Sequence, residues 1–286
     1  TYMLTPMMLQ QATSCSADNF INCTILLFVT YILSIRFDDK VKEISLRQSI
    51  ILGILMLFIS CSKIVYLPLC FLVFLLYNKL KNSPKLVKTI ITCSLLLSMI
   101  CAVCFYLYSM TYAVRVDYFK ENNINSSLQL KNVITNPFTY IVTLFNTLGK
   151  QQQLYITSFV GENLGWFNIN GSYFSTILFV ILLIIAPFLE KSKNFFKRHE
   201  KIIINLLVLL IFNFILGAMY LSWTSVGANV IEGVQGRYFI PIVFLTLLTL
   251  VMRNKHIEFK NTNIVYFIIA LLINVNSLYT VYSFFR

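Results

Sequence analysis

The chain has 286 residues, of which 58% are hydrophobic and only 12% are charged, and its mean hydropathy is +0.76. A soluble domain of this length does not need so much apolar surface, so the composition indicates an integral membrane protein. The net charge of +12 does not indicate a nucleic-acid-binding protein, because the basic residues lie in short clusters between apolar runs.

The apolar runs predict an all-α, polytopic bundle with about eight membrane crossings, forming one integral membrane domain over residues 1–286. Residues 1–9 are expected to be the end of an apolar helix whose beginning is missing, which would make the chain the C-terminal part of a longer protein. Residues 10–16 are expected to form a polar turn. The predicted crossings are 17–35, two within 48–77, 89–114, 172–189, 202–221, 237–252 and 264–285.

The region 48–77 is interrupted by Ser62 and Lys63, and basic loops flank it on both sides. Basic loops on both sides require an even number of crossings, so we expect the chain to cross twice with Lys63 at the apex. Each arm of about 15 residues would form an α-helix of roughly 22 Å, against a hydrocarbon core of about 30 Å. Lys63 is therefore expected below the outer membrane surface.

The distribution of Lys and Arg predicts the orientation. The four basic loops 36–47, 79–88, 191–201 and 253–260 contain 16 of the 23 Lys and Arg residues, so the positive-inside rule places them in the cytoplasm. The segment 115–171 then lies outside, where the apolar rhythm of its central part predicts one or two interfacial helices.

Cysteine and histidine do not point to a metal site. The seven cysteines form no pair of CxxC motifs, and the sequence pattern favours small apolar core residues. His199 and His256 lie in basic loops without an acidic or cysteine partner at ligand spacing. We therefore predict no zinc site.

Three charged residues on the outward side are candidates for chemistry. Lys63 and Arg237 open apolar helices, and together they could hold the oxygens of a phosphate group; the alternative is that both extend to the membrane interface, with Glu232 paired to Arg237. Two glycines before Arg237 would let the backbone approach whatever the arginine holds. Asp18 opens the first complete span, where the alternatives are a helix N-cap and a carboxylate that binds an acceptor or a metal or acts as a base.

The sequence Glu232–Pro241, EGVQGRYFIP, contains the most specific motif of the chain. It closely resembles the signature of a family of polytopic bacterial membrane proteins of unknown function, which in turn resemble C-type (GT-C) glycosyltransferases. Shorter stretches are similar as well: 6–18, the turn 62–69 with Ile64 in place of the usual proline, Asn136–Phe138 and Leu164–Trp166.

This resemblance implies a bacterial plasma-membrane enzyme that moves a sugar from a polyprenyl-phosphate donor to an extracytoplasmic cell-surface glycopolymer or lipid acceptor. It implies no certain cofactor, and a divalent cation is optional. Nucleic acid is not an expected partner. The resemblance implies that Asp18 is the second acidic residue of the active site. The residues implied at the lipid phosphate are Lys63, Arg237 and Tyr238, and the implied accessory residues are Glu232, Gln235 and Trp166. The family's first catalytic carboxylate has no counterpart in this chain. A flippase or transporter, or a polymerase, for lipid-linked saccharides is the alternative, although the spans hold almost no ionisable residues for a translocation path.

Overall fold

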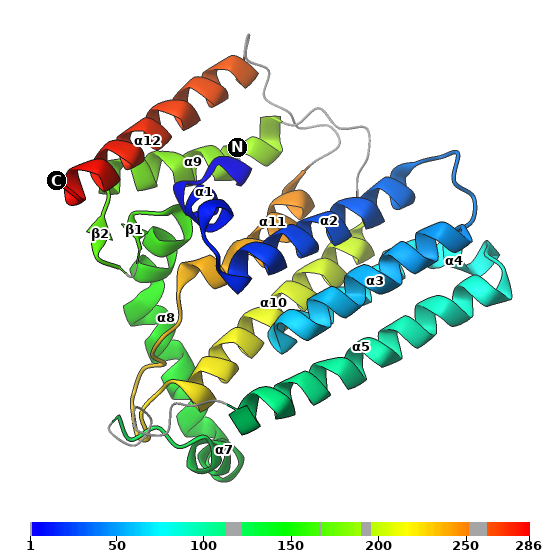
Figure 1. Ribbon diagram of the computed structural model, residues 1–286, viewed down its shortest axis with the longest axis horizontal. Coiled ribbons are helices and arrows are strands. Elements are labelled where there is room, and N and C mark those ends of the chain that lie inside the picture. The colour runs from blue at the N-terminus through cyan, green and yellow to red at the C-terminus, as the bar shows by residue number, and fades with distance from the viewer. Residues whose placement is uncertain (1, 113–121, 166, 190–195, 252–261) are drawn as a thin grey trace. The chain divides into compact units, whose positions relative to one another are not determined.

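The computed structural model describes residues 2–112, 122–165, 167–189, 196–251 and 262–286, which are almost entirely helical (Figure 1). Residue contacts divide the chain into two compact units. Unit 1 contains residues 1–15, 118–197 and 215–286, and unit 2 contains residues 16–117 and 198–214. The described part confirms the all-α class, with one two-stranded sheet as its only β structure.

Unit 2 is a bundle in which α3 packs against its neighbours α2 and α5. Its elements are α2 (Ala17–Phe37), α3 (Leu46–Ser62), the 3-10 helix η2 (Ile64–Leu76), α4 (Tyr77–Asn82), α5 (Lys85–Tyr112) and the first part of α10 (Arg198–Ser222). A capping box starts α3, since Ser45 Oγ accepts from the Gln48 amide and the Gln48 side chain accepts from the Ser45 amide. Gly53 permits the close approach of α3 to α5, because a Cβ there would lie 2.4 Å from Ser94 Oγ.

The chain reverses direction at Lys63, as predicted from the interrupted apolar region. Lys63 has an extended backbone (φ −149°, ψ 116°) between the end of α3 and the start of η2. Cys70 Sγ donates to the Met56 carbonyl at 3.9 Å, and these two residues lie seven positions on either side of Lys63. The two arms therefore run antiparallel.

The second arm of this hairpin is longer than predicted. A 3-10 helix rises about 2.0 Å per residue, compared with about 1.5 Å in an α-helix, so η2 alone extends roughly 26 Å and α4 continues it. Ile64–Asn82 is accordingly long and apolar enough to cross a membrane. The prediction of two equally short arms is wrong for this arm and holds for α3, which has 17 residues.

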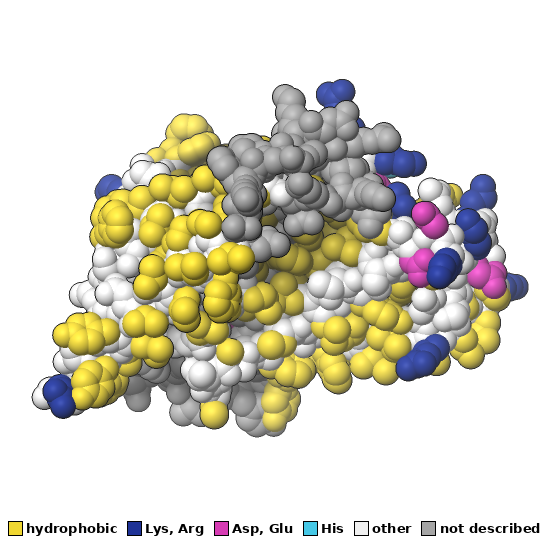
Figure 2. Space-filling view, turned by 90° about the horizontal axis from the view of Figure 1, so that it is seen from above, with side chains coloured by type: hydrophobic (Ala, Val, Ile, Leu, Met, Phe, Trp, Pro, Cys, Tyr) yellow, Lys and Arg dark blue, Asp and Glu magenta, His cyan; other side chains and the backbone are white. Residues whose placement is uncertain are grey.

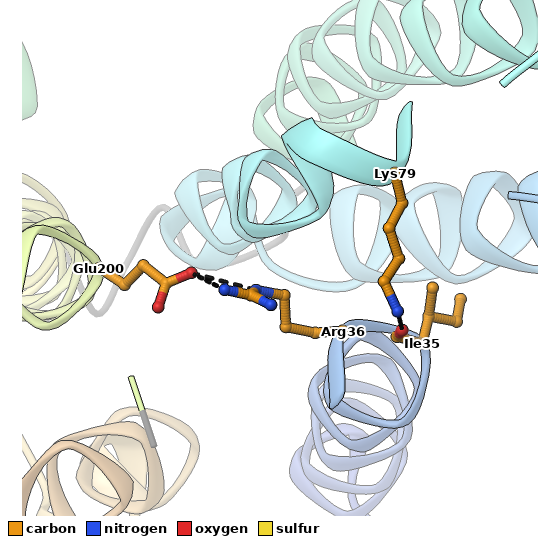
Figure 3. Close-up of polar contacts among 4 residues, drawn as sticks. All are labelled: Ile35, Arg36, Lys79 and Glu200. Atoms are coloured by element: carbon orange, nitrogen blue, oxygen red, sulfur yellow. Dashed lines mark hydrogen bonds and ion pairs between the residues drawn. The ribbon is translucent and has the colours of Figure 1, made fainter. Parts of the chain in front are cut away.

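Three of the four basic segments meet at one end of unit 2. Lys79 Nζ donates to the carbonyl of Ile35, and Arg36 donates to Glu200 Oε1 at 2.7 Å (Figure 3). Lys79 Nζ also donates to the carbonyl of Asp38. The Ile44 amide donates to Ser83 Oγ at 2.8 Å. Figure 2 shows Lys and Arg side chains gathered at this end beside Asp and Glu. The side of the membrane on which these segments lie stays a prediction, and the segment 253–260 lies outside the described residues.

Unit 1 contains the remaining helices and the small sheet. They are η1 (Tyr2–Leu4), α1 (Pro6–Thr13), α7 (Ser126–Thr135), α8 (Pro137–Val160), β1 (Asn163–Leu164), β2 (Ile169–Asn170), α9 (Tyr173–Leu189), η3 (Gly236–Phe239), α11 (Ile240–Leu250), α12 (Thr262–Phe284) and the last turns of α10. The antiparallel strands pair Asn163 with Asn170 and Leu164 with Ile169.

The start of the chain differs from the prediction. Thr5 caps the beginning of α1, with its Oγ1 accepting from the Met8 amide at 3.2 Å and Pro6 in the first helical position. Residues 1–9 are therefore not the end of one helix, and residues 10–13 belong to a helix instead of a turn. Thr-Pro is a helix-start signal, which the apolar composition of the segment concealed.

The segment 122–165 contains two helices, α7 and α8, in agreement with the number predicted, and their place at the membrane interface stays a prediction. Helix α8 ends before Gly161, whose positive φ of 110° closes the helix in the left-handed conformation.

Five helices of the described chain are long and apolar enough to cross a membrane, and they are Ala17–Phe37, Ile64–Asn82, Lys85–Tyr108, Arg198–Ser222 and Ile264–Phe284. Three more apolar helices are shorter, and they are Leu46–Ser62, Tyr173–Leu189 and Gly236–Leu250. Only 11% of the apolar window of α12 is buried, and hydrophobic side chains cover much of the face in Figure 2. So much exposed apolar surface is typical of contact with lipid. The number of eight crossings stays a prediction.

Candidate functional site

The structure brings two of the predicted site residues of unit 2, Asp18 and Lys63, into contact. Lys63 Nζ donates to Asp18 Oδ1, although the two residues lie 45 positions apart in the chain. The Asp18 side chain is 14% exposed and the Lys63 side chain is 31% exposed, so the ion pair is partly shielded from water. The place where Asp18 and Lys63 meet is called the Asp18–Lys63 corner below.

The helices explain why these side chains meet. Ser16, and not Asp18, occupies the N-cap position of α2, so Asp18 lies in the first turn, where the helix dipole favours a carboxylate. The alternative prediction of Asp18 as the N-cap is therefore wrong. Lys63 is held where α3 ends, and its carbonyl accepts from the amide of Tyr66, a residue that is only 2% exposed.

The predicted residues near Arg237 lie in unit 1, in a loop that is fixed to its surroundings by hydroxyl groups. Three of them accept hydrogen bonds from loop amides: Thr147 Oγ1 from Ile231 at 2.8 Å, Thr224 Oγ1 from Glu232 at 3.0 Å and Ser158 Oγ from Gly236 at 2.8 Å. A loop held by two side chains of α8 and by Thr224, which follows α10, presents its residues in one defined arrangement.

The two glycines of the motif serve the packing of this loop. A Cβ at Gly236 would lie 2.0 Å from the carbonyl oxygen of Tyr155. Gly233 has φ +77°, and a Cβ there would lie 2.0 Å from the Trp223 ring. The expectation that these glycines admit a ligand is therefore replaced by a structural role: they let the loop press against α8 and against Trp223.

Arg237 and Tyr238 remain partly exposed while the next residue anchors them. The ring of Phe239 is buried and meets the ring of Tyr155 edge to face, with centroids 5.4 Å apart. The guanidinium carbon of Arg237 lies 5.8 Å from the centroid of the Tyr238 ring. The cation and the aromatic ring of the motif therefore lie together on a fixed turn.

The accessory residues are less clearly placed. Glu232 is exposed and its carboxylate accepts from Ser225 Oγ at 3.4 Å, so the predicted pairing of Glu232 with Arg237 is not found among the described contacts. Gln235 precedes η3, and its carbonyl accepts from the Tyr238 amide at 3.0 Å. Trp166 lies outside the described residues.

Helix α8 carries a stripe of hydroxyl groups that was not predicted from the sequence. Thr143, Thr147, Tyr155 and Ser158 are all buried and follow one another at helical spacing on one face. The Tyr155 side chain is 7% exposed, and its hydroxyl has no hydrogen-bond partner among the described residues. Burial raises the pKa of Tyr155 to about 12, so its hydroxyl stays a neutral donor at physiological pH. Hydroxyls repeating at helical spacing were the signal that would have identified this face.

The two groups of predicted residues belong to different units, Asp18 and Lys63 to unit 2 and Arg237 and Tyr238 to unit 1. A phosphate site shared by Lys63 and Arg237 therefore stays a prediction. Within the described ranges, no group of three or more His, Cys, Asp or Glu side chains is placed to hold a metal ion.

One family model, described as a predicted membrane protein (DUF2142), matches residues 1–246. The matched stretch includes both the Asp18–Lys63 corner and the loop that carries Arg237. No curated protein and no solved structure matches the chain.

Proposed function

The chain belongs to the DUF2142 family of predicted membrane proteins, and we propose that it is a membrane glycosyltransferase. Its donor is a sugar linked to a polyprenyl phosphate. Its acceptor is a glycopolymer or lipid on the outer side of a bacterial plasma membrane.

The reaction needs two kinds of protein group. A hydroxyl oxygen of the acceptor forms a bond to the anomeric carbon of the sugar while the bond from that carbon to the phosphate oxygen breaks. The hydroxyl proton passes to a base, and the released lipid phosphate gains negative charge. A carboxylate and at least one cation are therefore required.

The contact between Asp18 and Lys63 is the observation that carries the proposal. A protein that only anchors itself in a membrane has no need to hold a carboxylate and an ammonium together in a partly buried corner, since desolvation of the two charges costs free energy. In the proposed mechanism Asp18 binds the acceptor or assists its deprotonation, and Lys63 contributes positive charge toward the phosphate.

Arg237 is a separate candidate cation in unit 1. Its guanidinium can donate two parallel hydrogen bonds to phosphate oxygens, and the hydrogen bonds to Thr147, Thr224 and Ser158 keep its loop in one arrangement. A preorganised cation stabilises the developing charge without reorganisation during the reaction.

The test measures transfer in membranes that contain the full-length protein and a radiolabelled polyprenyl-phosphate sugar. Arg237→Ala and Lys63→Ala are compared with Lys131→Ala, an exposed position on α7. At equal protein levels we expect both site variants to lose at least tenfold in rate, since a fixed electrostatic donor typically contributes 10²-fold or more. The Lys131 variant should match the wild type.

Equal rates in the Arg237 variant and the wild type would remove Arg237 from the mechanism. If the wild type transferred none of several donor sugars but moved the lipid-linked saccharide between leaflets of reconstituted vesicles, the protein would be a flippase and the proposal would fail.

A further inference from the structure

Asn22 is a buried polar residue one helical turn after Asp18 on α2. The two residues are four positions apart, so their side chains lie on the same face of the helix, one turn from each other. Asn22 is 3% exposed, and the residues that continue this face, Ile21 and Ile25, are at most 1% exposed. An amide group therefore lies where the helix otherwise buries isoleucine.

The amide nitrogen of Asn22 has no hydrogen-bond partner among the described residues. A buried amide donor without a partner is costly, so its presence in a native protein requires an explanation. Asn19, three residues before Asn22 on the same helix, is less buried than Asn22. Its side-chain oxygen accepts from Cys23 Sγ at 3.5 Å.

The groups at this corner differ in hydrogen-bonding character. The Asp18 carboxylate only accepts, the Lys63 ammonium only donates, and the Asn22 amide carries both a donor and an acceptor. A phosphate group only accepts, so it can bind the Lys63 ammonium or the Asn22 amide but cannot donate to the Asp18 carboxylate. A sugar hydroxyl both donates and accepts, so a carbohydrate can satisfy Asp18 and Asn22 at the same time.

We propose that Asn22 and Asp18 form a carbohydrate-binding subsite in unit 2, in which the Asn22 amide donates to a hydroxyl oxygen and Asp18 accepts from a hydroxyl. This inference rests on the proposed function and assigns its acceptor side: the Asp18–Lys63 corner holds the hydroxylated acceptor, and Lys63 keeps the carboxylate in place. Asn22 is a binding residue, and the bond-forming step does not involve it.

The test replaces Asn22 with leucine, which has nearly the same shape and no polar atoms. The purified full-length protein in detergent is heated with methyl glucoside, methyl galactoside or N-acetylglucosamine, and separately with inorganic pyrophosphate, and the shift in Tm is titrated. Asn213→Leu, at an exposed asparagine of α10 in the same unit, is the control.

We expect at least one sugar to raise the Tm of the wild type and of Asn213→Leu, and Asn22→Leu to need at least tenfold more of that sugar for the same shift. Its Tm without sugar should be equal to or higher than that of the wild type, because the variant loses an unpaired buried amide. The pyrophosphate titration should be unchanged. Asn22→Ser, which keeps a short donor, should bind the sugar with intermediate affinity.

Three results would overturn the inference: equal sugar titrations in Asn22→Leu and the wild type, loss of the pyrophosphate effect instead of the sugar effect, or no protection by any of the three sugars. The transfer assay separates this inference from the proposed function. Transfer with an unchanged acceptor KM in Asn22→Leu would refute the subsite alone, whereas sugar protection through Asn22 without any transfer would refute the glycosyltransferase alone.

Discussion

Replacing Gly236 with alanine tests whether the Arg237 loop packs against α8 as the structure shows. The new Cβ would lie 2.0 Å from the Tyr155 carbonyl oxygen and 2.4 Å from the Phe159 amide nitrogen. Both neighbours are helix backbone, which cannot rotate away as a side chain can. The loop must therefore move by about 1 Å, because carbon and oxygen atoms in contact lie more than 3 Å apart.

This movement has two costs that add. Overpacking of this kind costs about 1–3 kcal/mol. Loss of the hydrogen bond from the Gly236 amide to Ser158 leaves a buried donor unpaired, at a further cost of about 1–3 kcal/mol. We expect unfolding to require about 2–6 kcal/mol less free energy and the Tm to fall by roughly 10 °C.

Gly149 provides the matched control on α8, because a Cβ there would meet nothing within 4 Å. Gly149→Ala should leave the stability unchanged or raise it by about 1 kcal/mol, as alanine favours the helix. Thermal unfolding of both variants in the same detergent, followed by intrinsic tryptophan fluorescence, gives the comparison. A Gly236→Ala protein that melts within 2 °C of Gly149→Ala would show that this loop does not press on α8, and the reasoning would be refuted.

Two further predictions concern stability. Glu200→Gln should destabilise the protein by about 3 kcal/mol, because it leaves the partly buried Arg36 without a carboxylate. The control Glu43→Gln, at an exposed position, should have the Tm of the wild type. Equal Tm values for Glu200→Gln and Glu43→Gln would contradict this role of Glu200. Because burial raises the pKa of Tyr155 to about 12 from an ordinary value of 10.0, its contribution to stability is complete below pH 10 and is lost as the pH rises through about 12. Between pH 10 and pH 12 the wild type should lose up to about 3 kcal/mol of unfolding free energy that Tyr155→Phe keeps, because phenylalanine does not ionise. Chemical unfolding across this pH range measures the difference, and parallel pH profiles would refute the shift.

Much of the secondary structure could be predicted from local sequence. The apolar runs indicated α2, α3, α5 and the helices from α9 to α12, and the polar interruption at Lys63 predicted the reversal between α3 and η2. These features depend on residues close together in the chain, since apolar length, charge clusters and helix signals act locally. Where the local signal was misread, as at Thr5 and Pro6, the error was also local.

The geometry of the second hairpin arm could not be predicted in this way. Its length depends on the choice between 3-10 and α-helical backbone, and the apolar composition of 64–76 is compatible with both.

The candidate site was only partly predictable. The residue types at Asp18, Lys63 and Arg237 indicated chemistry, but the sequence could not show that Lys63 contacts Asp18 while Arg237 belongs to another unit. It also could not show that Gly236 serves packing against Tyr155, or that Asn22 faces the interior beside Asp18.

The sequence by itself thus determined that this is a helical membrane protein, where most of its apolar helices lie, and which charged residues interrupt them. Only the tertiary structure decided which of those residues meet. The physical reason is that a helix forms from contacts three or four residues apart, whereas the rotation of each helix about its axis, and so the partner of each polar side chain, is set by packing against helices that are distant in the chain.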